Sequence, residues 1–262
     1  MIPVDYITEW SNNTPWSDPR DVEQDLIICR ALIAIYSDPW LSSKLAFRGG
    51  TAIHKLYLPP QARYSEDIDL VQIKPEPIGE TLDRLKEALS FISIPKTKRK
   101  ESNNTLHYTF ESEPEPRIPR MLKIEINCRE HFSVFGYHDL SFALKNSWFS
   151  GQAVIKTYHI EELIGTKIRA LFQRKKGRDL FDLYWVLKNG RIDIDLAVKC
   201  FYEYFRHAGG SVPKKKVFVK NLEEKINDPD FRSDLSPILR QDVDYDIDDA
   251  YRTVMDQIIE RL

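Results

Sequence analysis

Apolar residues recur at spacings of three and four near the start of the chain, a pattern typical of an amphipathic helix. Asp18 is suited to the N-cap of this helix and Pro19 to its first turn, and the apolar face continues as far as Tyr36. We therefore expect a helix that packs on a sheet. Residues 1–16 lack this period, and we expect irregular chain there, held to the body by two tryptophans.

The middle of the chain alternates short strands with helices, which favours an α/β fold. The segment from Met121 to Cys128 alternates strictly, with leucine and isoleucine on one face and Lys123, Glu125 and Asn127 on the other. The elements predicted before it are a strand over 45–47, a helix over 51–58, a strand over 66–73, a helix over 79–91, and paired strands over 94–100 and 105–111.

From about residue 158 the apolar period is that of helices alone. The change of pattern predicts two domains, an α/β domain over residues 1–157 and a helical domain over 158–262. Helices are predicted over 159–173, 178–187, 193–205, 214–226 and 248–262.

Composition narrows the class of protein. The chain has 262 residues, of which 42% are hydrophobic and 30% charged, enough for a core inside a polar surface. No apolar run approaches the ~20 residues that cross a bilayer, so no membrane association is expected. The N-terminus does not resemble a secretory signal. Three isolated cysteines fit neither a disulfide framework nor a zinc site and favour a cytoplasmic protein.

Positive charge is clustered although the net charge is only −2. Three basic runs stand out, over 96–100, 174–178 and 214–216. Local patches of this kind can bind polyanions in a protein of near-neutral total charge. Each run is equally compatible with a solvated turn or helix end, and the sequence leaves both interpretations open.

Two aspartates in the predicted strand over 66–73 are the main candidates for chemistry. Asp67 and Asp69 are two positions apart, so both carboxylates project from one face of the strand. Close carboxylates repel unless a cation lies between them, and Mg²⁺ commonly binds one or two carboxylates together with water and substrate phosphates. Upstream, Gly49 and Gly50 open a helix whose backbone N–H groups could hold phosphate. Each motif alone is common in ordinary turns and surface loops.

Further polar residues extend this candidate site. Glu125 lies on the polar face of its strand, as a third acid or as a solvent-facing residue. In the helical half, Lys167 lies on the helix before Asp179 and Asp182, which share a helix face. This lysine could form a structural bridge to the two acids or could bind a triphosphate.

Five ordered motifs resemble a known family. They are G-G-T-A-x-x-x-L, R-Y-S-E-D-I-D-L, L-K-I-E-I, E-E-L-x-x-x-K-I-R-A-L and R-K-K-G-R-D-L-F-D-L, between residues 47 and 187. This order is similar to that of the AbiEii/AbiGii nucleotidyltransferase-like toxins of type IV toxin–antitoxin systems, a family that includes the MenT group. The resemblance implies a DNA-polymerase-β-like α/β (α+β) fold, a mixed sheet with flanking helices, and a C-terminal helical domain that closes the cleft.

The resemblance also implies roles for residues of this chain. Asp67, Asp69 and Glu125 would be the catalytic acids and the metal ligands, while Lys167 and Asp179 would be catalytic residues of the helical domain. The residues expected to bind nucleotide are Gly49, Gly50, Thr51, Ser65, Lys167 and Arg178. Gly49-Gly50 lies further upstream of the acids than the Gly-Ser of compact nucleotidyltransferases does, and Ser65 is equally suited to an ordinary hydrogen-bonded turn.

The implied activity is Mg²⁺-dependent transfer of a nucleotide from NTP to an acceptor hydroxyl, at the tRNA 3′ end, by a two-metal mechanism. A cognate antitoxin is the implied partner. Two alternatives stay open: a protein or small-molecule acceptor, which the near-neutral charge favours slightly, and an inert binding module of the same fold. A serine hydrolase is disfavoured because the chain has no Gly-x-Ser-x-Gly motif.

Overall fold

The computed structural model describes residues 2–100 and 102–262. The chain forms two compact units. The first consists of Met1–Leu56, Tyr64–Phe132 and Gly136–Tyr158, and the second of Tyr57–Arg63, Ser133–Phe135 and His159–Leu262. The second unit therefore takes in two short segments, Tyr57–Arg63 and Ser133–Phe135, that precede its helices in the sequence.

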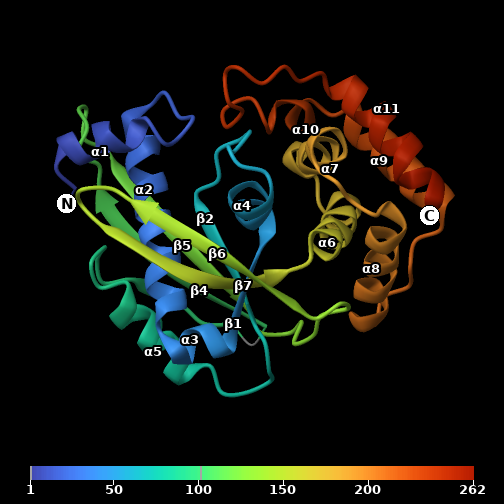
Figure 1. The fold of residues 1–262 in the computed structure, drawn as a ribbon. Coiled ribbons are helices and arrows are strands. Elements are labelled where there is room, and N and C mark those ends of the chain that lie inside the picture. The colour runs from blue at the N-terminus through green and yellow to red at the C-terminus, as the bar shows by residue number, and fades with distance from the viewer. Residues whose placement is uncertain (1, 101) are drawn as a thin grey trace. The chain divides into compact units, whose positions relative to one another are not determined.

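A seven-stranded mixed sheet forms the centre of the first unit, in the order β3-β4-β5-β2-β1-β7-β6 (Figure 1). The pairs β2–β5 and β1–β7 are parallel and the others are antiparallel. The strands are β1 (Leu45–Arg48), β2 (Asp67–Gln72), β3 (Lys96–Lys98), β4 (Asn103–Glu111), β5 (Pro119–Asn127), β6 (Tyr137–Lys145) and β7 (Ser150–Tyr158). The expected mixed sheet with flanking helices is confirmed.

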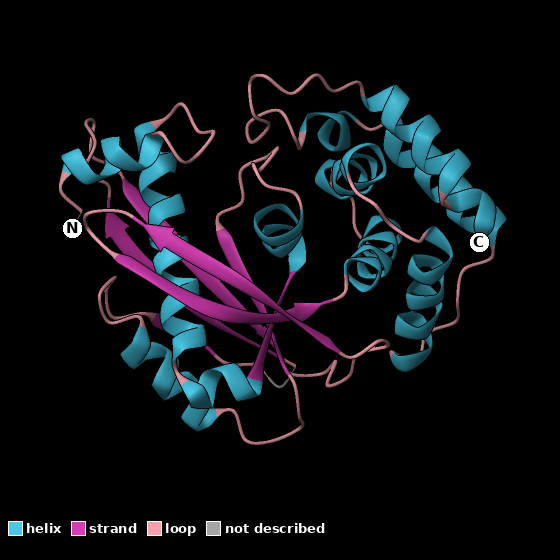
Figure 2. Cartoon of the chain, in the orientation of Figure 1, coloured by secondary structure: helices cyan, strands magenta, loops and turns pink. Residues whose placement is uncertain are grey.

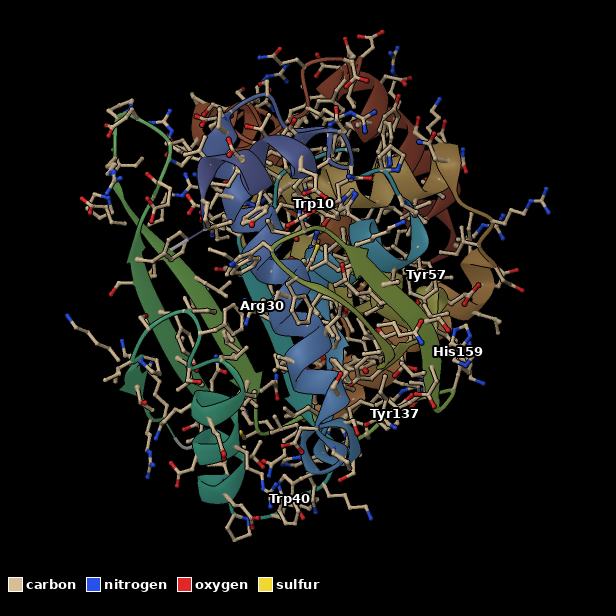
Figure 3. The ribbon with its side chains drawn as sticks, turned by 60° about the vertical axis from the view of Figure 1, so that its left-hand side comes forward. Trp10, Arg30, Trp40, Tyr57, Tyr137 and His159 are labelled. Atoms are coloured by element: carbon tan, nitrogen blue, oxygen red, sulfur yellow. The ribbon has the colours of Figure 1, made fainter. Side chains whose placement is uncertain are left out.

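Helices accompany this sheet in the first unit and are drawn in cyan in Figure 2. They are α1 (Val4–Ser11), α2 (Pro19–Ser37), α3 (Pro39–Lys44), α4 (Gly49–Ala52) and α5 (Gly79–Ala88); a π-helical turn (Ile53–Tyr57) continues α4. The helix predicted to begin at Asp18-Pro19 is α2. Asp18 caps it as expected, since its side chain accepts the Arg20 backbone N–H at 2.9 Å. Arg30 of α2, labelled in Figure 3, lies over the rings of Phe91 and Trp148 at 4.0 and 4.4 Å.

Two parts of the first unit differ from the sequence-based expectation. The segment predicted to be irregular over 1–16 contains a helix, because Val4–Ser11 forms α1 and packs on α2, and the part after Ser11 is irregular as expected. Trp10, labelled in Figure 3, anchors it by donating its indole N–H to Asp25 at 3.1 Å. The hairpin of β6 and β7 was not predicted, because its side chains are mostly exposed or half-buried and give no clear apolar face.

The second unit is built almost entirely of helices. They are α6 (Ile160–Gln173), α7 (Gly177–Asn189), α8 (Ile194–His207), α9 (Lys215–Ile226), α10 (Pro229–Ser233), α11 (Ile247–Gln257) and a 3-10 turn (Ile259–Arg261). Helices α6 and α8 pack closely at Gly165, where a Cβ atom would lie 2.5 Å from Cys200. Phe181 of α7 packs with Ala62, Leu235 and Val243 in a buried cluster. No helix among the described residues has the length and apolar character needed to cross a membrane.

A buried glutamate of α2 makes the stability of the first unit depend on pH. Glu23 is 0% exposed; its Oε2 accepts the Glu113 backbone N–H at 3.1 Å, and its Oε1 has no hydrogen-bond partner among the described residues. Burial raises the pKa of Glu23 to about 7. The protonated form is therefore favoured by folding, and its stabilisation is lost as the pH rises towards this folded-state pKa.

We expect Glu23→Gln to be more stable than the wild type at pH 8 by about 2 kcal/mol, because glutamine cannot ionise. At pH 4 the two proteins should have nearly equal free energies of unfolding. Urea unfolding at both pH values measures this difference. An equal pH dependence in the two proteins would show that Glu23 is not the titrating group.

Candidate active site

The two aspartates of β2 lie where the sequence predicts them. Ile68 and Leu70 are buried on one face of the strand, whereas Asp67 and Asp69 are half-buried on the other. Strand alternation thus puts both carboxylates on a polar face while the intervening residues fill the core.

The neighbouring strand β5 adds polar groups to the same face. It runs parallel to β2, with Asp69 paired to Glu125 and Asp67 paired to Lys123. The Lys123 Nζ lies 2.9 Å from Asp67 Oδ2 and 3.3 Å from Glu125 Oε2. Asn103 of β4 donates its side-chain N–H to Glu125 Oε1 at 2.5 Å. Three carboxylates therefore share the face with one ammonium group.

Burial and like charge determine the electrostatics of this cluster. Burial raises the pKa of Asp69, and the neighbouring charges of Asp67 and Glu125 raise it further. Burial alone would lower the pKa of Lys123, but Asp67 and Glu125 outweigh it, so the pKa of the lysine is raised. The cluster thus favours any arrangement that brings more positive charge to Asp69.

The glycine turn at the end of β1 packs directly against Asp69. Gly49 has a φ of 81°, and a Cβ atom built on it would lie 2.3 Å from Asp69 Oδ2. Thr51, which follows in α4, donates its hydroxyl to the Asp67 backbone carbonyl at 2.8 Å. The Thr51 and Ser65 hydroxyl oxygens are 2.5 Å apart. These contacts hold the turn to the aspartate strand and bring together Gly49, Gly50, Thr51, Ser65, Asp67, Asp69 and Glu125 in one unit.

The donor set fits Mg²⁺ as a site that substrate would complete. Among the residues the structure describes, no three acidic, histidine or cysteine side chains form a ready-made metal site. Asp67 and Asp69 nevertheless supply the one or two carboxylates that Mg²⁺ usually takes, with phosphates and water filling its other positions. Glu125, engaged by Asn103 and Lys123, can add a further oxygen ligand.

The helical unit contains a second charged cluster, which is centred on two buried aspartates. The Lys167 Nζ lies 3.0 Å from Asp179 and 2.6 Å from Asp182. Arg63 makes a two-pronged contact with Asp182 at 2.6 and 2.8 Å, and Arg174 makes one with Asp179 at 2.6 and 2.7 Å. Burial alone would raise the pKa of Asp179, but Lys167 and Arg174 outweigh it and hold this pKa below its usual value.

The structure also locates Arg178, the remaining residue of the predicted set. Its guanidinium contacts Asp234 at 3.0 and 3.1 Å instead of the aspartates on its own helix. Arg178 is therefore adjacent to the Lys167 cluster in sequence but engaged with a different acid.

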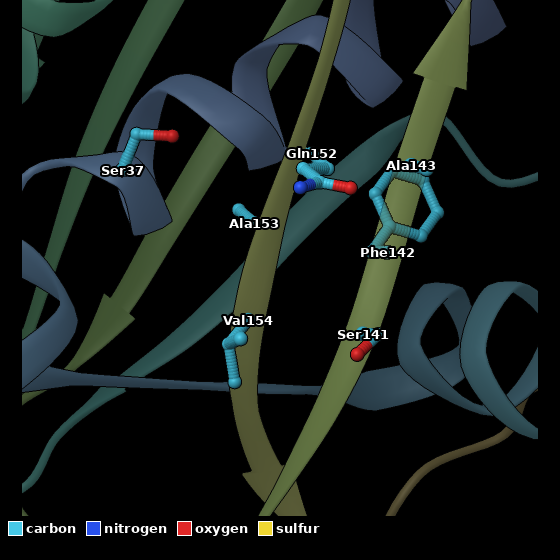
Figure 4. Close-up of a pocket in the computed structure, with 7 residues that line it drawn as sticks. All are labelled: Ser37, Ser141, Phe142, Ala143, Gln152, Ala153 and Val154. Carbon is cyan, nitrogen blue, oxygen red and sulfur yellow. The ribbon is translucent and has the colours of Figure 1, made fainter.

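A shallow pocket on the β6–β7 hairpin, shown in Figure 4, lies outside this polar face. It is lined by Ser37 of α2 and by residues 141–143 and 152–154 of the two strands. None of these side chains is ionisable, so the pocket offers no acid or base for proton transfer and no charged ligand for a metal ion.

Comparison with known proteins identifies the family. Residues 30–253 match the family described as "Nucleotidyl transferase AbiEii toxin, Type IV TA system". The chain belongs to the AbiEii family. This match spans most of the chain and includes both the carboxylate face and the Lys167 cluster. No curated protein is significantly similar in sequence.

Solved structures share the fold of this AbiEii protein. "MenT4, nucleotidyltransferase toxin Rv2826c from Mycobacterium tuberculosis H37Rv" is similar with a TM-score of 0.60 and 12% identity, over 97% of this chain and 99% of that one. JHP933 from Helicobacter pylori is similar with a TM-score of 0.58 and 19% identity, over 93% of each chain. At these identities the likeness concerns the fold.

Sequence reasoning missed two participants in these clusters. From the sequence, Lys123 is only one residue of the polar face of its strand. Its position beside Asp67 follows from the pairing of β2 with β5, which the sequence does not give. Arg63 was missed because 119 residues separate it from Asp182 and no local pattern joins them.

The Gly49 turn can be tested with a matched glycine. We expect Gly49→Ala to destabilise the protein by about 2–4 kcal/mol, because the new Cβ atom combines an unfavourable φ with a clash against Asp69. Gly136→Ala is the control, since Gly136 has a φ of 82° with nothing within 4 Å of its Cβ position. Thermal unfolding measures the stability of both variants. An equal loss of stability in the two would contradict a steric role for Gly49.

The Lys167 cluster gives a second prediction. We expect Lys167→Met to lower the free energy of unfolding by about 3 kcal/mol, because two buried carboxylates lose a shared partner. Lys188→Met is the control, because Lys188 is 49% exposed and lies 3.7 Å from Asp249. Urea unfolding compares the variants. If Lys167→Met were as stable as Lys188→Met, the lysine would not be a structural bridge.

Proposed function

We propose that this AbiEii protein transfers a nucleotide from NTP to an acceptor hydroxyl, that of the tRNA 3′ end. The observation that carries the proposal is the contact of the Gly49 turn with Asp69. This contact places a glycine backbone, which phosphate can approach closely, beside carboxylates that would hold the metal of a Mg²⁺–triphosphate.

In the proposed mechanism, Asp67 and Asp69 would hold Mg²⁺, and Glu125 would join them in holding a second ion. Bound there, Mg²⁺ supplies charge stabilisation to the triphosphate and lowers the pKa of the acceptor hydroxyl. The Gly49-Gly50 turn holds phosphate through its backbone, and the hydroxyls of Thr51 and Ser65 keep that turn on the aspartate strand.

We also propose that Lys167 and Arg178 contact the phosphates of NTP, with Asp179 orienting the lysine. Support comes from the charge of the cluster itself. Three cations, Arg63, Lys167 and Arg174, gather at the carboxylates of Asp179 and Asp182, and a dense group of cations attracts an anionic ligand. A cation without a reactive role of its own suits the neutralisation of a leaving pyrophosphate.

Transfer to a protein or small-molecule hydroxyl is the second candidate function, and the near-neutral total charge supports it. An inert binding module is disfavoured by the carboxylate cluster, since keeping like charges together without a catalytic use would only lower stability. The proposed setting is the cytoplasm, with NTP as substrate and a cognate antitoxin as partner.

The decisive experiment incubates the protein with each α-labelled NTP, Mg²⁺ and total tRNA, beside Asp69→Asn and the exposed control Asp256→Asn. We expect Asp69→Asn to lower transfer by about 100-fold or more, as for removal of a group that stabilises transition-state charge. Its Tm should stay equal or rise, because a buried charge with a raised pKa is removed. Asp256→Asn should match the wild type in both measurements.

Three outcomes separate the candidates. Label on tRNA that is lost in Asp69→Asn supports the proposal. Label on protein in a matched cell extract, again lost in Asp69→Asn, would show that the acceptor is a protein and that the nucleotide-transfer reaction is as proposed. Full activity in Asp69→Asn would overturn the site assignment.

A further inference from the structure

The carboxylate face of the sheet extends beyond the acids to the edge of the first unit. Cross-strand partners share a face, so the pairings can be followed from strand to strand. One row runs from Asp69 through Glu125 and Thr105 to Lys98.

A second row, two positions away along each strand, runs parallel to the first. It joins Asp67, Lys123, His107 and Lys96 through the same pairings. The two rows together define what we call the acceptor face: Asp67, Asp69, Lys96, Lys98, Thr105, His107, Lys123 and Glu125.

Burial along the strands shows that this face is the open one. On β4, Leu106 and Tyr108 are fully buried, and the Tyr108 hydroxyl donates to the Leu85 carbonyl of α5 at 3.3 Å. Thr105 and His107 point the other way and are half-buried. The helix α5 therefore covers the opposite side of this part of the sheet.

Charge changes sign along the acceptor face. The acids lie on β2 and β5, whereas Lys96 and Lys98 lie on the edge strand β3, where every side chain is exposed. Among the described residues, neither lysine has an ion-pair partner, in contrast to Lys123, which bridges Asp67 and Glu125. Two uncompensated positive charges thus lie on the face that carries the carboxylates.

We propose that the acceptor face binds the single-stranded end of a polynucleotide, with Lys96 and Lys98 on its backbone phosphates and its terminal hydroxyl at the carboxylates. This inference rests on the proposed transfer function and adds the path by which the acceptor reaches the carboxylates. Three strand spacings of about 4.8 Å separate β2 from β3, about 14 Å in all, or roughly four phosphate intervals of a helically stacked strand.

The groups between the two ends of the path suit the same ligand. His107 lies between Lys96 and Lys123, and an imidazole ring can stack on an unpaired base. Polyanion contacts are needed away from the carboxylates, because the acids would otherwise repel the acceptor's phosphates. Lysine on an edge strand also protects against aggregation, and that role alone predicts no effect on RNA binding.

The test measures RNA binding without NTP. A fluorescein-labelled single-stranded RNA of about 12 nucleotides and total tRNA are titrated, between 50 and 200 mM salt, against the wild type and Lys96→Gln/Lys98→Gln. The matched control is Lys74→Gln/Lys145→Gln, which removes two exposed lysines of the same unit, one of them on β6 at the opposite edge of the sheet. Thermal unfolding verifies that all three proteins fold alike.

We expect the Lys96/Lys98 variant to bind both RNAs about tenfold more weakly at 50 mM salt. Its slope of log affinity against log salt should be smaller by about 1.4, since each single-strand phosphate contact contributes about 0.7. The Lys74/Lys145 variant should bind like the wild type, and Mg²⁺–NTP binding should be equal in all three proteins.

Equal RNA affinity in the two double variants would overturn the acceptor face, as would a wild type that binds no RNA at 50 mM salt. A labelled poly-glutamate peptide that bound as tightly as RNA, with the same loss in the variant, would also overturn it in favour of an acidic protein.

Failure of the face and failure of the transfer reaction give different results. If Lys96→Gln/Lys98→Gln loses RNA binding but the wild type transfers nothing to RNA, RNA binding by the acceptor face is supported and the transfer reaction is contradicted. If the wild type labels tRNA and the variant does so with the same KM for tRNA, the transfer reaction is supported and RNA binding by the acceptor face is contradicted.

Discussion

The gathering of three carboxylates on one face of a sheet is the constraint on which the active-site unit depends. Asp67 and Asp69 come from β2 and Glu125 from the parallel strand β5, so their proximity follows from the pairing register. Unbalanced charge at such short range would be costly in a partly buried site. Lys123 offsets part of it through its ion pairs with Asp67 and Glu125, whereas the pKa of Asp69 stays raised. The least compensated acid is thus the one that the Gly49 turn touches.

The two units handle buried charge differently, and the difference matches the roles proposed for them. In the helical unit, Asp179 and Asp182 are fully buried and each is matched by at least two cations, so their negative charge is compensated within the protein. In the sheet unit, three half-buried acids share one lysine. The first arrangement is suited to holding helices together, and the second to accepting a cation from outside.

Family membership and the site geometry are independent observations that support the same proposed function. The AbiEii match covers residues 30–253 and shows which family the chain belongs to. The likeness to MenT4 and JHP933, at 12% and 19% identity, shows that those structures share the fold over nearly the whole of this chain. What the chain itself contributes is the contact of Gly49 with Asp69 and the path of polar residues from β2 to the basic edge strand β3.

The sequence by itself determined the elements whose signals are local. The Asp18 cap, the alternation around Asp67 and Glu125, and the helical period after residue 158 each act within a few residues, and the corresponding elements α2, β2, β5 and α6 formed close to their predicted bounds. Helix α1 escaped prediction because its buried face depends on α2 and on Asp25, and the β6–β7 hairpin because its partly exposed strands carry a weak pattern. Only the tertiary structure decided that Lys123 pairs with Asp67, that Arg63 reaches Asp182, and that Lys98 shares a row with Asp69. Strand register and long-range ion pairs join residues far apart in the chain, and their energies depend on positions that no local pattern of residues specifies.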